Sequence, residues 1–210
     1  MSLELEPLNK NLGVLLFPGF EMLDVYGPLS IFSLLPGLTI TLVSENGGRV
    51  AASGGPESWA SESFASDMHY DFILIPGGMG TRTEVNNPKL LEWIKDQGVK
   101  VEYCLSVCTG SALLAAAGLL KGKRATSNKF AFQWVSSLCT ETLWKYQARW
   151  VEDGNLFTSS GVSAGIDMSL GFIAHIYGHE VAEKCALLIE HTWHQNADED
   201  AFADYYHKLA

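Results

Sequence analysis

Four short apolar runs in the first half of the chain have the character of buried strands: Leu12–Phe17, Thr39–Ser44, Asp71–Ile75 and Lys100–Leu105. Continuous apolar runs of this length are typical of strands covered on both faces, as in a parallel sheet. The first run ends at Pro18-Gly19 and the third at Pro76-Gly77-Gly78, and both are turn sequences. The pattern therefore predicts a sheet of buried strands.

Segments with helical pattern or composition separate and follow these runs: Leu23–Leu35, Pro88–Gln97, Thr109–Ala117, Phe130–Leu138, Ala164–Ile176 and His179–His194. Gly27-Pro28 is expected to begin or kink the first helix, whereas Pro88 and Gly98 suit the start and end of the second. Trp150–Phe157, with Asp153-Gly154 at its centre, predicts a hairpin. This alternation predicts a doubly wound, mostly parallel sheet with ligands at the carboxyl ends of its strands.

The length of the chain favours one domain. Its 210 residues are enough to bury a core without disulfides or metal, and no repeat, linker or low-complexity tract divides them. Residues 1–10 include Glu4 and Glu6 and lack the basic start and apolar run of a signal peptide, so we expect a short tail there. Residues 11–210 are expected to form a single domain.

Composition excludes several classes of partner. The formal net charge of −10 leaves no basic patch for phosphates, so nucleic-acid binding is not expected. No apolar stretch approaches the ~18 residues that a membrane span needs, so no membrane partner is expected. Cys104, Cys108, Cys139 and Cys185 contain no Cys-x-x-Cys pair and are too few for a disulfide scaffold. The expected location is a reducing cytoplasm.

Cys108 lies where the fourth apolar run passes into the helix at Thr109–Ala117, with Ser106 two residues before it and Gly110 two residues after it. Small residues at these two positions permit the sharp turn of a nucleophile elbow, which exposes the central side chain. A helix N-terminus beside the sulfur favours the thiolate. The pattern singles out Cys108 as a nucleophile and leaves the other three thiols as core or inert residues.

Negative charge developing at Cys108 would need backbone N–H donors. The N–H of Thr109 follows Cys108 directly, and Gly77 and Gly78 lie in the turn that ends a neighbouring strand. Glycine permits close approach of the backbone to a reacting group. We therefore predict that Gly77, Gly78 and Thr109 bind the oxyanion or substrate, although Pro-Gly-Gly by itself is also the sequence of an ordinary tight loop.

Several motifs, in this order, resemble those of the ThiJ/PfpI superfamily (class I glutamine amidotransferase-like) and, within it, the isonitrile hydratase branch: Phe17-Pro18-Gly19-Phe20, Leu23-Asp24-Val25, Ile75-Pro76-Gly77-Gly78, Ser106-Val107-Cys108-Thr109-Gly110-Ser111, Ala117–Thr126 and Gly161–Asp167. The match runs from about Leu12 to Glu190, and ThiJ/PfpI-like sensor domains of AraC-type regulators carry the same motifs. The resemblance implies a flavodoxin-like three-layer α/β/α sandwich, commonly dimeric, with a nucleophilic cysteine at the elbow.

The resemblance also implies an acidic residue of the first helix close to the sulfur, and by motif that residue is Asp24. A carboxyl group that shares a site with a thiolate is pushed toward its protonated form, in which it acts as acid and base. Without the resemblance, an aspartate at a helix N-terminus is more simply explained by the helix dipole. We predict that Asp24 and Cys108 are the catalytic residues.

The chain departs from its relatives at two places. Many protease-like relatives have His directly after the nucleophile, whereas this chain has Thr109. A cysteine protease mechanism with an adjacent His as base is therefore not available, and peptidase activity is disfavoured. Many relatives also have a His-Trp pair after the Ala-Thr of the later motif, where this chain has Ser127-Asn128-Lys129-Phe130. Whether the Asn128-Lys129 loop alters specificity is left open by the sequence.

Other residues give no signal for a metal or cofactor. His175 and His179, like His191 and His194, have spacings that could put both rings on one helix face, but no His-Glu-x-x-His arrangement accompanies them. Gly77–Gly80 has neither the Walker lysine nor the dinucleotide spacing. We predict no metal and no cofactor.

Three functions fit the sequence. The leading hypothesis is a cofactor-independent lyase that hydrates an isonitrile to an N-formamide, with a small electrophile as its substrate and a homodimer as its assembly. The second keeps the thiol chemistry but acts on a glyoxal or an amide, like a glyoxalase, deglycase or amidase. The third is a ligand- or redox-sensing domain related to those of AraC-type regulators, in which Cys108 is oxidised or lines a pocket.

Overall fold

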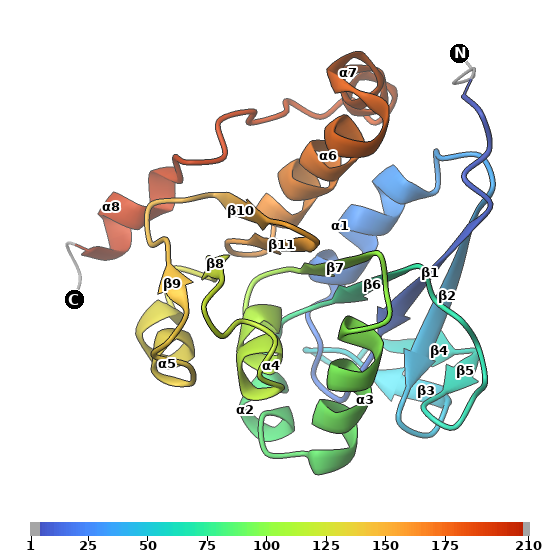
Figure 1. Cartoon of the computed structure of the whole chain (residues 1–210), viewed down its shortest axis with the longest axis vertical. Helices are drawn as coiled ribbons and strands as arrows, with labels where there is room; N and C mark the ends of the chain where they lie inside the picture. The colour runs from blue at the N-terminus through green and yellow to red at the C-terminus, as the bar shows by residue number, and fades with distance from the viewer. Residues whose placement is uncertain (1–4, 208–210) are drawn as a thin grey trace.

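A mostly parallel sheet forms the centre of the molecule. The computed structural model describes residues 5–207, and its main sheet has the strand order β10-β11-β7-β6-β1-β2-β5 (Figure 1). Only β10 and β11 pair antiparallel within this sheet. The strands are β1 (Lys10–Leu15), β2 (Leu38–Ser44), β5 (Glu62–Ser63), β6 (Phe72–Ile75), β7 (Tyr103–Ser106), β10 (Trp150–Asp153) and β11 (Leu156–Ser159).

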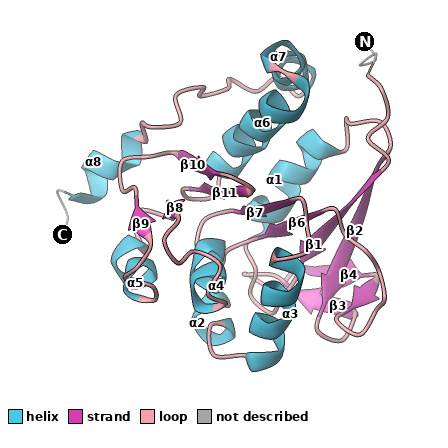
Figure 2. Cartoon of the chain, in the orientation of Figure 1, coloured by secondary structure: helices cyan, strands magenta, loops and turns pink. Residues whose placement is uncertain are grey.

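Helices cover both faces of this sheet, as Figure 2 shows. One face carries α1 (Met22–Phe32), α6 (Ala164–Tyr177) and α7 (His179–Leu188), and the other carries α2 (Thr81–Glu84), α3 (Pro88–Gly98) and α4 (Gly110–Ala116). The remaining elements are two hairpin strands, β3 (Gly48–Ala51) and β4 (Glu57–Ala60), the short pair β8 (Arg124–Ala125) and β9 (Leu143–Trp144), and the helices α5 (Phe132–Ser137) and α8 (Ala201–His207). The predicted flavodoxin-like three-layer sandwich is confirmed.

Aromatic packing joins the α1–α6 layer to the sheet. The ring of Phe172 in α6 lies edge-on to Phe32 of α1 and to Phe72 and Phe157 of the sheet, at centroid distances of 5.2 to 6.0 Å. All four rings are buried. Since burying one such side chain stabilises the fold by about 1.5–3 kcal/mol, this cluster fixes the helices that lie next to the end of β7.

The structure decides one helical prediction between its alternatives and corrects another. Pro28 lies inside α1 and so does not begin the helix, and Val25 and Ile31 on either side of the proline are fully buried. The predicted helix at His179–His194 ends at Leu188, since Glu190 takes a left-handed backbone conformation (φ +53°) that breaks the helix. The predicted hairpin at Trp150–Phe157 is confirmed by β10 and β11.

The beginning of the chain lies against the fold. The N–H of Leu8 donates to the carbonyl of Pro36 at 2.9 Å, and the Tyr177 hydroxyl donates to the carbonyl of Glu6 at 3.0 Å. Residues 1–4 of the expected tail lie outside the described residues. Across residues 5–207, no helix is both long and apolar enough to cross a membrane.

Candidate active site

Cys108 occupies a sharp turn between β7 and α4. Its φ of +57° lies in the left-handed region that a residue with a side chain rarely adopts. Gly110 passes so close to β6 that a Cβ there would lie 2.2 Å from the carbonyl oxygen of Ile75. Ser106, on the other side of the turn, is fully buried. The small–x–Cys–x–small pattern therefore corresponds to a nucleophile elbow in which position +2 must be glycine.

Asp24 reaches the same place from α1. Its side chain is fully buried, and its Oδ2 accepts a hydrogen bond from the N–H of Gly77 at 2.8 Å. A Cβ on Gly77 would lie 2.5 Å from the nitrogen of Thr109 and 2.9 Å from Oδ2 of Asp24, so only glycine fits between the two. The turn after β6 thus brings α1 and the elbow together.

Burial raises the pKa of Asp24 from its ordinary value of 3.8 to about 7, and the negative charge of Glu21 adds to the rise. The Gly77 N–H and the Cys108 side chain act in the opposite direction, because both favour the carboxylate. The Oδ1 atom is buried and has no hydrogen-bond partner among the described residues. Near neutral pH this carboxyl group can therefore exist in either protonation state, as an acid–base catalyst requires.

Burial also raises the pKa of the Cys108 thiol, to about 12, and the charge of Asp24 raises it further. The N–H groups of Val162 and Thr109 favour the thiolate but do not outweigh these effects. The expectation of a thiolate favoured by the helix N-terminus is therefore wrong for the resting site, because only 7% of Cys108 is exposed and a carboxyl group lies beside it. A base that removes the thiol proton would therefore be needed for this sulfur to act as a nucleophile.

The predicted anion-binding residues meet at the site, but not all of their N–H groups point to the sulfur. The N–H of Gly77 donates to Asp24, and the N–H of Gly78 donates to Oγ1 of Thr109 at 3.1 Å. The Thr109 hydroxyl also lies 3.1 Å from Oγ1 of Thr81. The two glycines thus position Asp24 and Thr109, while the Thr109 N–H itself interacts with the sulfur.

Val162, which the sequence analysis did not select, is the second N–H donor at the sulfur. It follows β11 and has a φ of +36°, which is unusual for a β-branched residue. Asn128 packs against the preceding turn, since a Cβ on Gly161 would lie 2.5 Å from its Nδ2 atom. The available signal was the position of Gly161-Val162 after a strand that neighbours β7, because the carboxyl ends of adjacent parallel strands meet at one edge.

The remaining thiols and histidines have other surroundings. Cys104 and Cys185 are fully buried, and Cys139 is partly exposed. His175 lies 3.0 Å from a carboxylate oxygen of Glu152, and His191 lies 2.9 Å from one of Asp167. Within residues 5–207, no group of three or more His, Cys, Asp or Glu side chains is arranged to hold a metal ion.

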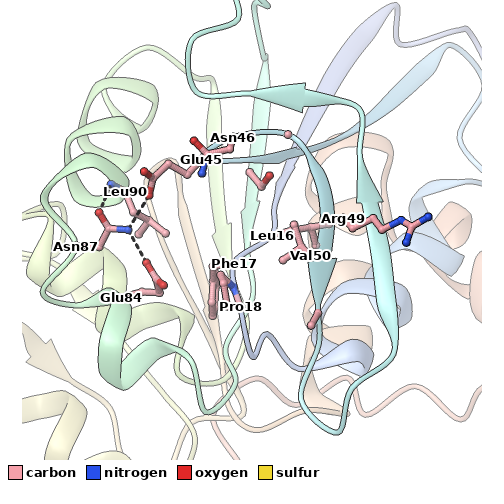
Figure 3. A pocket seen from close by; sticks show the side chains of 13 residues that line it. Leu16, Phe17, Pro18, Glu45, Asn46, Arg49, Val50, Glu84, Asn87 and Leu90 are labelled. Atoms are coloured by element: carbon pink, nitrogen blue, oxygen red, sulfur yellow. Dashed lines mark hydrogen bonds between the residues drawn. The ribbon is translucent and has the colours of Figure 1, made fainter.

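A separate cavity of about 320 Å³ lies beyond the carboxyl ends of β1 and β2 (Figure 3). There the Asn87 amide lies between two carboxylates and donates to Glu84 at 2.8 Å and to Glu45 at 3.0 Å. Lys89 forms an ion pair with Glu45 at 3.1 Å. The hydrogen bond from Asn87 and the contact with Lys89 lower the pKa of Glu45. Neither Cys108 nor Asp24 lines this cavity.

The chain is similar to several known proteins. It is 36% identical to the isonitrile hydratase of Pseudomonas putida over 180 residues, and this matched region covers 86% of this chain and 78% of that protein. It is 26% identical to the HTH-type transcriptional regulator CdhR of Pseudomonas aeruginosa over 83% of this chain and 53% of that protein. The crystal structure of a ThiJ/PfpI family protein from Pseudomonas syringae superposes with a TM-score of 0.81 at 31% identity, covering 86% of this chain and 74% of that chain.

A family model supports the same relationship. The model of the DJ-1/PfpI family matches residues 10–175, which include the first strand, the elbow and most of α6. This range contains Asp24, Gly77 and Cys108. The resemblance to the ThiJ/PfpI superfamily is therefore confirmed, and the chain belongs to the DJ-1/PfpI family.

Proposed function

We propose that this protein is a cofactor-independent lyase that adds water to an isonitrile and releases an N-formamide. The observation that carries the proposal is the buried pair of Asp24 and Cys108, in which a carboxyl group with a pKa of about 7 lies beside a thiol with a pKa of about 12. The similarity to an isonitrile hydratase supports the choice of substrate class. The amino acid after the nucleophile is Thr109, whose hydroxyl cannot act as a base near neutral pH.

In the first step, the Asp24 carboxylate accepts the thiol proton as the Cys108 sulfur bonds to the terminal carbon of the isonitrile. The same proton is then donated to that carbon, which gives a thioimidate, R–N=CH–S–Cys108. The thiol does not have to ionise in advance, which its raised pKa would oppose. The Thr109 and Val162 N–H groups stabilise negative charge on the sulfur while the proton is on Asp24.

In the second step, Asp24 removes a proton from water as its oxygen adds to the thioimidate carbon, and the nitrogen takes up that proton. The adduct collapses when the C–S bond breaks, the hydroxyl proton leaves through Asp24, and the sulfur regains it. The products are R–NH–CHO and the starting thiol, so one water is consumed and no redox partner is needed. Unlike amide cleavage, the overall addition expels no amine, and the site therefore needs no further acid for a leaving group.

Two other functions are tested by the same panel of substrates. A glyoxal-directed or amide-directed thiol enzyme would use Cys108 and Asp24 with a different electrophile. A sensing domain is favoured by the similarity to a transcriptional regulator. The raised pKa of Cys108 argues against rapid oxidation, because redox-sensing cysteines are accessible and have low pKa values.

A homodimer in the cytoplasm is the assembly and location we propose. Met22, Leu23 and Tyr26 on α1 and Trp59 on β4 are exposed apolar side chains, and the Tyr26 hydroxyl contacts Ser58 of β4 at 2.6 Å. These residues provide an apolar surface on the helix that carries Asp24 and on the neighbouring β4. Light scattering with size-exclusion chromatography would give twice the chain mass, and Trp59→Glu would reduce it.

Steady-state assays with alkyl and aryl isonitriles, methylglyoxal and simple amides test the reaction. We expect formation of an N-formamide that is lost in Cys108→Ala. Turnover of a glyoxal or amide with no isonitrile hydration would replace the proposal with the second function. Inactivity toward the whole panel, with saturable binding of a small ligand, would replace it with the third.

A further inference from the structure

The strained backbone at Cys108 is held from both sides by hydrogen bonds. The N–H of Cys108 donates to the carbonyl of Ser160 at 3.0 Å. The carbonyl of Cys108 accepts from the hydroxyls of Ser111 at 3.1 Å and Ser127 at 3.0 Å. A residue with a side chain in this left-handed conformation carries about 1–3 kcal/mol of strain, so it persists only where its surroundings impose it. Ser127 and Ser160 come from segments distant in sequence.

The segment of Ser127 is anchored by a buried ammonium group. Lys129 donates through Nζ to the carbonyl of Ala148 at 2.6 Å, to Oγ1 of Thr126 at 3.0 Å and to the carbonyl of Ser127 at 3.4 Å. Only 1% of the Lys129 side chain is exposed, and burial lowers its pKa to about 8. Lys129 therefore fixes the residue whose hydroxyl binds the Cys108 carbonyl.

The segment of Ser160 is anchored by a second buried cation. The N–H of Ser160 donates to the backbone carbonyl of Arg149 at 2.8 Å. The Arg149 guanidinium pairs with Asp167, with its two contacts at 2.6 and 2.7 Å. Arg149 thus ties the residue that accepts the Cys108 N–H to the first turn of α6.

One carboxylate joins these two anchors. Asp200 lies 3.7 Å from Lys129 Nζ through Oδ2 and 3.6 Å from Arg149 through Oδ1, and 1% of its side chain is exposed. Its Oδ1 also accepts from the N–H of Phe202 at 3.1 Å, at the start of α8. The other titratable groups at this cluster are Tyr146, whose ring lies 5.8 Å from the Lys129 ammonium, and Asp167 with its partner His191.

We propose that Asp200 is a positioning residue for Cys108, acting through Lys129 and Arg149 on the two peptide groups of the elbow. The inference rests on the proposed role of Cys108 and extends it to a carboxylate that does not contact the sulfur. Without the charge of Asp200, the buried Lys129 would lose the carboxylate that raises its pKa, and Arg149 would keep only its pair with Asp167. Lys129 would then give up its proton more easily, its hydrogen bonds to the segment of Ser127 would weaken, and the segments of Ser127 and Ser160 would be held less firmly. The elbow would relax, and the Thr109 and Val162 N–H groups would no longer be directed at the sulfur.

The test measures the reaction of Cys108 with iodoacetamide by mass spectrometry between pH 6 and 9. All variants carry Cys139→Ala, because Cys139 is the more exposed thiol. Asp200→Asn should lower the rate constant about tenfold and flatten the inflection that Asp24 produces near pH 7. Glu199→Gln, which changes the exposed carboxylate next to Asp200 in the segment before α8, should leave the profile unchanged. This reaction needs no isonitrile, so it tests the inference even if hydration is absent.

A double-mutant cycle of Asp200→Asn with Ser127→Ala tests whether Asp200 acts on Cys108 through Ser127. If Asp200 acts partly through Ser127, the effect of Asp200→Asn should shrink to about threefold or less once Ser127 has lost its hydroxyl. Should Asp200→Asn fail to fold, the neutral pair Lys129→Met with Asp200→Asn keeps the test, because it removes both charges at once. This variant also removes the anchor of Ser127, so the rate constant of Cys108 should fall at least as far as expected for Asp200→Asn, and a parental rate constant would overturn the proposal. A pH profile that superposes on the parent, with only the melting temperature lowered, would overturn the proposal, and so would fully additive effects.

Discussion

Two carboxylates at the carboxyl edge of the same sheet differ in almost every property. Asp24 is fully buried, faces a thiol and forms no ion pair with any residue between 5 and 207, and burial raises its pKa to about 7. Glu45 keeps 29% of its side chain exposed and contacts Asn87 and Lys89, which lower its pKa. Both residues lie at the sheet edge where α/β proteins bind ligands. Position in the fold therefore does not determine which carboxyl group can carry a proton.

The pKa values of Asp24 and Glu45 differ because the neighbouring segments supply different hydrogen-bond and ionic partners to the two carboxyl groups. The turn after β6 has glycines at positions 77 and 78, so its backbone approaches Asp24 and Thr109 without bringing a charge. The partners of Glu45 come from the start of α3, where the N-cap residue Asn87 provides an amide and Lys89 of the first turn provides an ammonium group. A carboxylate with such partners is stable as an anion, whereas one that receives a single N–H in a buried site takes up a proton near neutral pH.

The largest expected effect is the loss of all thiol-dependent turnover in Cys108→Ala. The sulfur forms the covalent bond in the proposed reaction, and no other described thiol lies at the elbow. Cys139→Ala is the matched control and should keep parental turnover, because this partly exposed thiol is remote in sequence from the elbow motif. Residual hydration in Cys108→Ala above the uncatalysed rate would assign the chemistry to another group.

The second effect is the pH dependence of stability. Asp24 has a folded pKa of about 7 and an ordinary value of 3.8, so between these values the folded state holds a proton that the unfolded state has lost. The contribution of Asp24 to the free energy of unfolding must therefore fall as the pH rises from 4 to 7, by about 4 kcal/mol at most. The measurement is urea unfolding of wild type and Asp24→Asn across this range, and the unfolding free energy of wild type relative to the variant should fall as the pH rises.

Glu45 should show the opposite sign. Its folded pKa is lowered, so its contribution is present above the ordinary pKa and is lost as the pH falls through the folded value. The difference in unfolding free energy between wild type and Glu45→Gln should therefore increase with pH. If the unfolding free energy of wild type relative to each variant changed with pH in the same direction for Asp24→Asn and Glu45→Gln, the contrast between the two carboxylates would be contradicted.

The elbow and the main strands were predictable because their signals are local. The apolar runs before Pro18 and Pro76, and the small residues around Cys108, each specify a conformation within a few positions. Asp24 was found through a family motif rather than through its spacing. The assignment of the DJ-1/PfpI family needed the order of several motifs along most of the chain.

Other features of the site could not be predicted from the sequence because they depend on contacts between segments that are distant in the chain. The pKa of Cys108 rises because the fold buries the sulfur beside Asp24, and no pattern around the elbow contains that information. The loop containing Lys129 reads as polar in sequence, yet its ammonium group is buried against Asp200. The hairpin of β3 and β4 was missed because its strands are short, partly exposed and weakly alternating.

The third expected effect is a drop in turnover of about 100-fold or more in Asp24→Asn, the amount a positioned acid or base usually contributes. The amide oxygen can still accept from Gly77, so the geometry should persist while the exchangeable proton is lost. Glu45→Gln is the matched control at the same sheet edge and should change turnover less than about twofold. In wild type, kcat/KM should rise with pH through about 7 as Asp24 becomes a carboxylate, and this limb should be absent in Asp24→Asn. Turnover within about threefold of wild type would make Asp24 structural.

The smallest effect is expected where the ion pair between Lys89 and Glu45 is broken. Lys89 is 73% exposed at its side chain, and its partner Glu45 keeps the hydrogen bond from Asn87 when the ammonium group is removed. Exposed ion pairs of this kind contribute about 0–1 kcal/mol, since water and salt screen them and both side chains lose freedom. Lys89→Ala should therefore shift the unfolding free energy by less than about 1 kcal/mol, with a smaller shift in high salt. Urea unfolding at low and high ionic strength measures both quantities, and a loss of several kcal/mol that persists in high salt would mean that this carboxylate, like Asp24, depends on burial.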